Sequence, residues 1–131
     1  MSDMPLKITL KSNEKLIVGG AVIRNGNGKC ELVIENTTPV LREPEILSAE
    51  AADSPCRRLY FIIQLMYIDE DNIRQYHQAY WDQTRRILDA APSMLGMIDG
   101  ISDRILQGQY YRALKKTREL IQYEEELLEN V

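Results

Sequence analysis

Two short runs decide the fold of this chain: Leu6-Lys7-Ile8-Thr9-Leu10-Lys11, and farther along Val40-Leu41-Arg42-Glu43-Pro44-Glu45-Ile46. In the first run, apolar residues alternate with Lys7, Thr9 and Lys11, which predicts a strand with one apolar face and one polar face. A strand with a cationic outer face suits an anionic polymer. Together the two runs indicate a protein that binds RNA and has no enzymatic activity.

The segment 5–47 is typical of a small β structure with five short strands. Asn25-Gly26-Asn27-Gly28 predicts a hairpin between strands at 21–24 and 29–35, because Asn and Gly adopt the positive φ of tight hairpin turns. About forty residues in short strands bury little area. We therefore expect this module to pair with a second chain, to pack on the rest of the chain, or both.

Helical signals follow the β segment. Ser54 suits a helix N-cap, and Pro55 suits the first helical position, where its missing N–H has no partner to lose. Apolar residues at three- and four-residue spacing run from Ile73 to Ala91, and a last helix is expected from about Gln109 to Glu129.

The predicted fold class is therefore α+β, with a small N-terminal antiparallel β module in residues 1–47 followed by an α-helical hairpin or bundle in residues 48–131. The chain has 131 residues and a net charge of −4, and the whole acidic excess lies in residues 48–131. A basic strip on the β module is compatible with this overall charge.

No apolar run approaches the roughly 18 residues of a membrane span, and the first residues lack the pattern of a secretory signal. We therefore expect a cytoplasmic protein with no membrane association. Cys30 and Cys56 have no metal-type spacing, which favours two free thiols. His77 is the single histidine and lies in an apolar stripe, so a core imidazole is the better interpretation than a metal ligand or base. We expect no catalysis, no metal and no cofactor.

Two features of the helical part leave alternatives open. The stripe of the second predicted helix, which includes Trp81, either belongs to the intramolecular core or recognises a protein partner. A basic cluster either contacts phosphate or forms a solvated face paired with nearby acids. Its members are Arg112, Lys115, Lys116 and Arg118.

Four segments resemble the FlbT family of flagellin post-transcriptional repressors: Met4-Pro5-Leu6-Lys7-Ile8-Thr9-Leu10-Lys11, Gly20-Ala21-Val22-Ile23-Arg24-Asn25-Gly26, Pro39-Val40-Leu41-Arg42-Glu43 and Pro55-Cys56-Arg57-Arg58-Leu59-Tyr60-Phe61. The resemblance covers essentially the whole chain. It implies binding to the 5′ untranslated region of flagellin mRNA, inhibited translation and promoted decay of that mRNA. It also implies a functional link to FlaF, a small helical flagellar regulator.

Residues 6–47 also resemble the carbon-storage regulator family, CsrA, in the runs Asn13-Glu14-Lys15-Leu16-Ile17-Val18-Gly19 and Val40-Leu41-Arg42-Glu43-Pro44-Glu45-Ile46. In that family five strands interleave between two chains, and the first strand of one chain forms the RNA site with the fifth of the other. Carried over, the RNA-binding residues are Lys7, Thr9, Lys11 and Arg42. Asn13 stands where the pattern has a glycine, and Pro44 enters the last motif.

The leading hypothesis is a cytoplasmic, homodimeric repressor of flagellin synthesis that binds the flagellin mRNA leader. The alternative is a flagellar adaptor that acts on mRNA only through a protein partner such as a FlaF-like regulator. The net acidic charge favours that alternative somewhat.

Overall fold

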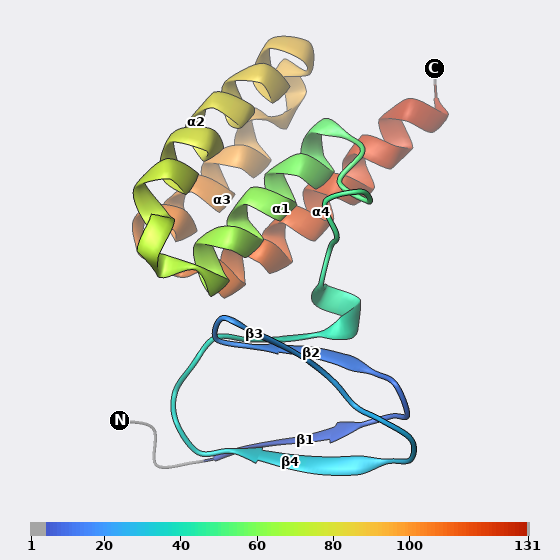
Figure 1. Cartoon of the computed structure of the whole chain (residues 1–131). Helices are drawn as coiled ribbons and strands as arrows, with labels where there is room; N and C mark the ends of the chain where they lie inside the picture. The colour runs from blue at the N-terminus through green and yellow to red at the C-terminus, as the bar shows by residue number, and fades with distance from the viewer. Residues whose placement is uncertain (1–4, 131) are drawn as a thin grey trace. The chain divides into compact units, whose positions relative to one another are not determined.

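The computed structural model describes residues 5–130 and confirms the α+β class, with small antiparallel sheets followed by four helices (Figure 1). The chain divides into two compact units, one ending at Ile46 and the other beginning at Leu47. We call the first the β module and the second the helical unit. No helix within residues 5–130 is long and apolar enough to cross a membrane.

The β module contains two antiparallel sheets that lie as two layers (Figure 1). One sheet pairs β1 with β4, and the other has the order β3-β2-β5. The strands are β1 (Leu6–Leu10), β2 (Lys15–Val18), β3 (Ala21–Arg24), β4 (Cys30–Ile34) and β5 (Val40–Arg42), and a 3₁₀ turn, η1 (Glu43–Glu45), follows. Pro44 lies in this turn near its start, a position that tolerates its missing N–H.

The predicted hairpin at 25–28 is wrong. β3 pairs with β2 and β4 pairs with β1, so the loop between β3 and β4 crosses from one sheet to the other. The side-chain amide of Asn25 donates to the carbonyl oxygens of Lys11 at 2.8 Å and Gly28 at 2.7 Å, which ties this loop to the end of β1. The tight hairpin instead joins β2 to β3 through Gly19 and Gly20, and Gly19 has a φ of +59°.

A small core closes between the two sheets of the β module. Ile8, Leu10 and Leu16 are buried at its centre. Partly buried hydrophobic residues surround them, namely Val18, Cys30, Leu32, Ile34 and Val40. Every strand of the module finds its partner strand within the same chain, so strand pairing here needs no interleaving with a second chain.

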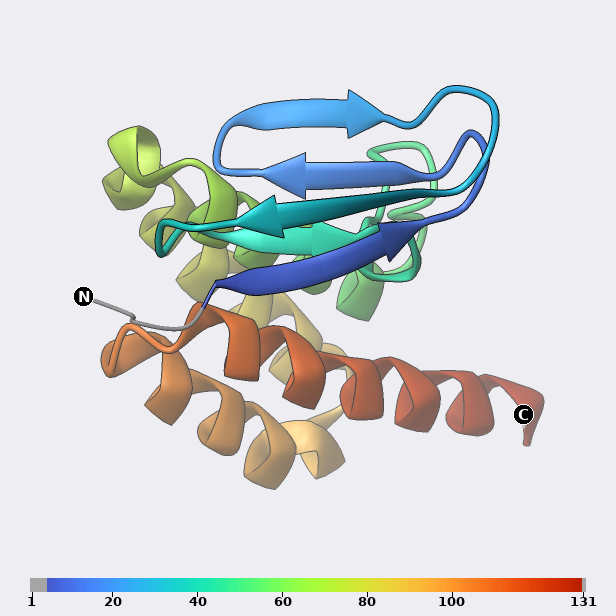
Figure 2. The same cartoon turned by 90° about the horizontal axis from the view of Figure 1, so that it is seen from below.

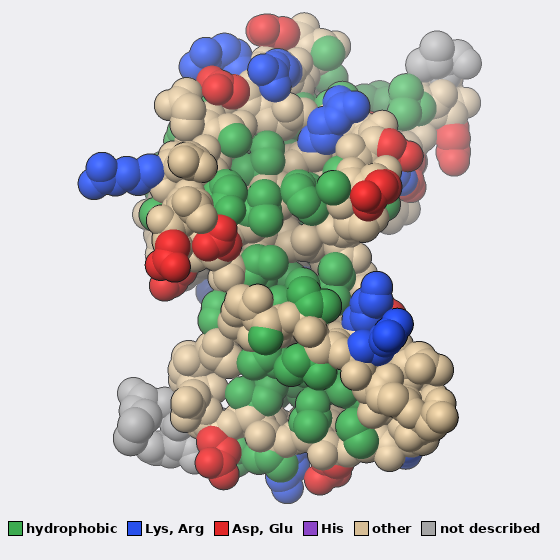
Figure 3. Space-filling model, in the orientation of Figure 1, with side chains coloured by type: hydrophobic (Ala, Val, Ile, Leu, Met, Phe, Trp, Pro, Cys, Tyr) green, Lys and Arg blue, Asp and Glu red, His purple; other side chains and the backbone are tan. Residues whose placement is uncertain are grey.

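The β module also leaves apolar side chains at its surface. Leu6, Val22, Ile23 and Val33 are exposed, and β3 has no buried residue. Figure 3 shows hydrophobic side chains on the face of the module that is drawn there.

In the helical unit, α1 packs against both α2 and α4 (Figure 1). Helix α3 packs against α4 (Figure 2). The helices are α1 (Pro55–Ile68), α2 (Ile73–Ala90), α3 (Leu95–Leu106) and α4 (Tyr110–Glu129), with 3₁₀ turns η2 (Glu70–Asn72) and η3 (Pro92–Met94) before α2 and α3. Large buried side chains from all four helices make the core, including Leu59, Ile63, Met66, Tyr80, Ile101, Ile105 and Leu120.

The N-terminus of α1 is capped twice. The predicted N-cap is confirmed, because the Ser54 hydroxyl accepts a hydrogen bond from the Arg57 N–H at 3.1 Å. The buried carboxylate of Glu124 on α4 accepts from the Ser54 hydroxyl at 2.5 Å and from the Cys56 N–H at 3.0 Å. A carboxylate is favoured at this end of a helix by the unpaired N–H groups and the helix dipole. Glu124 therefore belongs to the fold and not to a solvated acidic tail.

We expect Glu124→Ala to destabilise the helical unit by about 1–3 kcal/mol, because it leaves the Cys56 N–H and the Ser54 hydroxyl without their buried acceptor. Urea denaturation followed by circular dichroism measures the change. Glu126→Ala is the matched control, because this exposed glutamate lies on the same helix. Equal stability of the two variants would contradict the role given to Glu124.

Candidate functional site

The outer face of β1 carries three of the four residues predicted to bind RNA. Lys7 and Thr9 are exposed while Ile8 and Leu10 are buried, and Lys11 is exposed just after the strand ends. The alternation predicted from the sequence is therefore confirmed.

The partner strand makes this face less basic than β1 alone indicates. The register places Val33 opposite Lys7 and Glu31 opposite Thr9, and directly opposite residues share a face of the sheet. An acid and an exposed valine thus lie among the lysines. The surface is a mixed one, on which a few cations can contact phosphate without creating a uniform positive field.

The structure brings the fourth predicted residue, Arg42, to β1. Arg42 ends β5, and its Nη2 donates to the carbonyl oxygen of Thr9 at 2.8 Å. β1 and β5 belong to different sheets, so this side chain connects two strands that do not pair. The two segments singled out in the sequence therefore meet within one chain.

Glu14 forms an ion pair with Arg42, a role that was not predicted from the sequence. Its Oε1 accepts from the Lys11 N–H at 2.8 Å, and its Oε2 lies 3.8 Å from Arg42 Nη2. The Glu14 side chain is only 12% exposed, compared with 47% for Arg42. The sequence signal was its place in the run from Asn13 to Gly19, where a glutamate precedes the apolar residues of β2.

The turn that carries Glu14 depends on a left-handed residue. Asn13 has a φ of +63°, a conformation that glycine and asparagine adopt most readily. Its N–H donates to the Gly26 carbonyl at 3.0 Å, and the Asn25 N–H donates to the Glu14 carbonyl at 2.9 Å. The asparagine that stands in place of the motif's glycine is thus a residue suited to this left-handed conformation.

Arg42 keeps donors for a ligand. A guanidinium has five N–H groups in a planar fork. One of them binds Thr9, and the edge facing Glu14 is engaged electrostatically, while about half of the side chain is exposed. A fixed, partly exposed fork is suited to a base edge or a phosphate, and the nearby Lys7 and Lys11 suit phosphate.

The polar groups of the helical unit mostly satisfy one another. His77 Nε2 lies 3.1 Å from the Tyr110 hydroxyl, and the Tyr76 hydroxyl donates to Asp69, which lowers the pKa of that carboxyl. Trp81 packs edge-on against the buried Tyr80, yet remains partly exposed, so the stripe of α2 is only partly used by the core. Within residues 5–130, no three His, Cys, Asp or Glu side chains are placed to hold a metal ion.

Two members of the basic cluster on α4 lie over aromatic rings. Lys115 lies over the Tyr111 ring at 5.1 Å, and Arg118 lies over Tyr60 at 5.8 Å. Neither Arg112 nor Lys115 forms a salt bridge with any residue in the described range 5–130. Aromatic rings therefore contribute to holding Lys115 and Arg118 in place.

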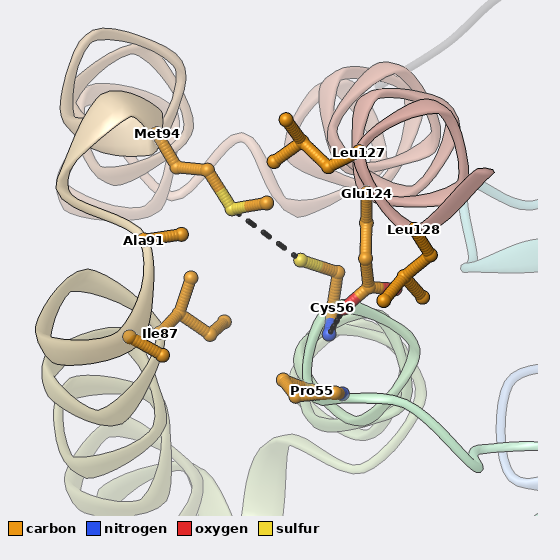
Figure 4. Close-up of a pocket in the computed structure, with 9 residues that line it drawn as sticks. Pro55, Cys56, Ile87, Ala91, Met94, Glu124, Leu127 and Leu128 are labelled. Carbon is orange, nitrogen blue, oxygen red and sulfur yellow. Dashed lines mark hydrogen bonds between the residues drawn. The ribbon is translucent and has the colours of Figure 1, made fainter. Parts of the chain in front are cut away.

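An apolar pocket of about 200 Å³ lies among α1, α2, η3 and α4 (Figure 4). The Cys56 thiol points to the Met94 sulfur at 3.9 Å, and Leu127 and Leu128 lie on the α4 side. Burial and the neighbouring Glu124 carboxylate raise the pKa of the Cys56 thiol far above its ordinary value. The thiol therefore stays protonated and is a poor nucleophile.

Comparison with known proteins places the chain among flagellar regulators. A family model described as "Flagellar protein FlbT" matches residues 6–128. A "Probable flagellum biosynthesis repressor protein FlbT 1" from Bradyrhizobium diazoefficiens is 44% identical over 125 residues, covering 95% of this chain and 85% of the relative. A counterpart in Rhodopseudomonas palustris strain TIE-1, named "Probable flagellum biosynthesis repressor protein FlbT", is 39% identical and covers 95% and 98%.

The "Flagellum biosynthesis repressor protein FlbT" of Caulobacter vibrioides strain ATCC 19089 is 35% identical over 130 residues, covering 98% of this chain and 92% of the relative. No solved structure matches the chain significantly.

We expect Cys56 to resist modification by thiol reagents in the native protein, because its thiol is buried and its pKa is raised. A Cys30→Ser variant isolates it. Reaction with Ellman's reagent at pH 8 should be slow in buffer and rapid in urea. Rapid reaction of native Cys30→Ser protein would contradict the protonated, buried thiol.

Proposed function

This chain belongs to the FlbT family of flagellar proteins, and on that premise we propose that it represses flagellin synthesis by binding the 5′ untranslated region of flagellin mRNA. Binding there inhibits translation and promotes decay of the message. The protein acts in the cytoplasm as a homodimer, without catalysis and without a cofactor.

The observation that carries this proposal is the hydrogen bond from Arg42 to the Thr9 carbonyl. It supports an RNA site made of Lys7, Thr9, Lys11 and Arg42 within a single β module. RNA loops are recognised through splayed bases that side chains at a sheet surface can reach. In this site Arg42 reads a base edge, and the two lysines contact the backbone.

The mixed charge of the surface bears on specificity. Glu14 and Glu31 lie among the cations, so few phosphates are neutralised on binding. Affinity that depends on few phosphate contacts falls only gently with salt. Recognition then depends on base contacts and on the shape of the RNA, which suits a repressor that must select one message among many.

The helical unit carries protein recognition in this proposal, with a FlaF-like flagellar regulator as the partner. The charge of the helical unit supports assigning protein recognition to it and RNA binding to the β module. The acidic excess of the chain lies in residues 48–131 and repels phosphate. The unit's exposed large apolar side chains also suit contacts with other protein chains, whether the FlaF-like regulator or a second copy of this chain: Trp81, Leu95, Leu106, Leu127 and Leu128.

The alternative is an adaptor that reaches mRNA only through that partner. The net charge of −4 is the observation that favours it. Filter binding on a flagellin leader, with the purified protein alone and with the FlaF-like protein added, separates the two. Our proposal predicts binding by the protein alone, with an affinity that falls only gently as the salt concentration rises. Binding only in the presence of the partner would establish the adaptor instead.

We expect Arg42→Ala to weaken binding to the flagellin leader by about 1–3 kcal/mol, as the loss of a base-reading arginine does. The effect on folding should be small, because the ion pair with Glu14 is partly exposed. Filter binding at fixed salt gives the affinity, and circular dichroism checks the fold.

Arg24→Ala is the matched control for this experiment. Arg24 is an exposed arginine on β3 of the same module, and its loss changes the net charge by the same amount. It should leave the affinity nearly unchanged. If both variants, or neither, lose affinity, Arg42 does not read a base.

A further inference from the structure

The helices α2 and α3 follow each other in the chain, but each packs mainly on another helix: α2 on α1, and α3 on α4. They make few direct contacts with each other. A groove of about 690 Å³ lies between them. A buried hydrogen bond of 2.8 Å between the hydroxyls of Tyr80 and Ser102 joins the two helices beneath it. The groove is therefore a formed surface feature with a fixed floor.

The lining of the groove combines apolar and polar side chains. Trp81 and Leu88 line it from α2, and Ile98 and Leu106 line it from α3. Leu106 is 70% exposed and lies at the edge of the groove. The exposed side chain of Leu106 and the groove thus lie on the same face of the helical unit.

Charges of opposite sign flank the groove. Arg85 lies on the α2 side, and Asp99 and Asp103 lie one turn apart on the α3 side. All three are exposed, and none forms a salt bridge with a residue of the described range 5–130. The face therefore offers an unpaired cation and two unpaired anions on facing rims.

We propose that this groove is the interface through which two copies of the chain associate. The inference rests on the homodimer of the proposed function and identifies the surface through which its two copies bind each other. A two-fold axis along the groove lays α2 of one copy over α3 of the other. Arg85 then faces Asp99 of the partner subunit, and Leu106 enters the partner's hollow, so the surface is complementary to itself.

The charge pattern selects this symmetry among the possible ones. A two-fold axis across the groove stacks α2 on α2 and sets Arg85 against its own copy, which is repulsive. The axis along the groove instead places Arg85 of each copy over the α3 rim of the other, which carries Asp99 and Asp103. The proposed interface would have Trp81 and Leu106 at its centre and charged residues at its rim. Stable protein interfaces commonly have such an apolar centre and polar rim.

Sedimentation equilibrium of the full chain tests the proposal. We expect a dimer at micromolar concentration, and Leu106→Glu should raise its dissociation constant at least about tenfold, as the loss of an interface anchor does. Leu95→Glu is the matched control, because Leu95 is 51% exposed on the same helix and does not line the groove. Circular dichroism shows that both variants are folded.

Charge reversal tests the symmetry. The single variant Arg85→Glu should weaken the dimer, and so should the double variant Asp99→Lys, Asp103→Lys. The triple variant that combines these changes should restore the dimer.

A monomeric wild-type protein, or a dimer unaffected by Leu106→Glu, would overturn the proposal. So would loss of FlaF-like binding by Leu106→Glu with self-association intact, since a helix of another protein then occupies the groove. RNA binding measured on the same variants reports separately on the repressor function.

Discussion

The contact between the Arg42 guanidinium and the Thr9 carbonyl is the constraint on which the candidate RNA surface depends. β1 and β5 lie in different sheets, and no strand pairing sets their relative position. Glu14 supports the contact and is itself held by the Lys11 N–H. The position of a single arginine thus follows from one turn, and the turn follows from the left-handed backbone of Asn13.

This arrangement changes how the likeness to interleaved carbon-storage regulators is understood. There, the first and fifth strands that form the site come from different chains. Here Arg42 and Thr9 meet within one chain, and each of the five strands pairs within it. The candidate site is therefore complete without a second chain, and the proposed association can use another surface, such as the groove between α2 and α3.

Local patterns predicted much of the fold. The alternation of β1, the Ser54 cap and the long helices follow from side-chain period and capping, which act over a few residues. Strand partners did not follow, because the turn at 25–28 is held by the distant carbonyl of Lys11. The roles of Glu14 and Glu124 were missed for the same reason: each depends on a contact that folding alone creates.

The most direct test of the central claim is a titration of isotopically labelled full-length protein with a flagellin leader RNA, followed by amide and arginine side-chain NMR. The account predicts that the resonances of Lys7, Thr9, Lys11 and the Arg42 guanidinium shift together with one affinity. It also predicts that the resonances of α4 stay in place. Shifts confined to the helical unit, with β1 and Arg42 unchanged, would contradict the account.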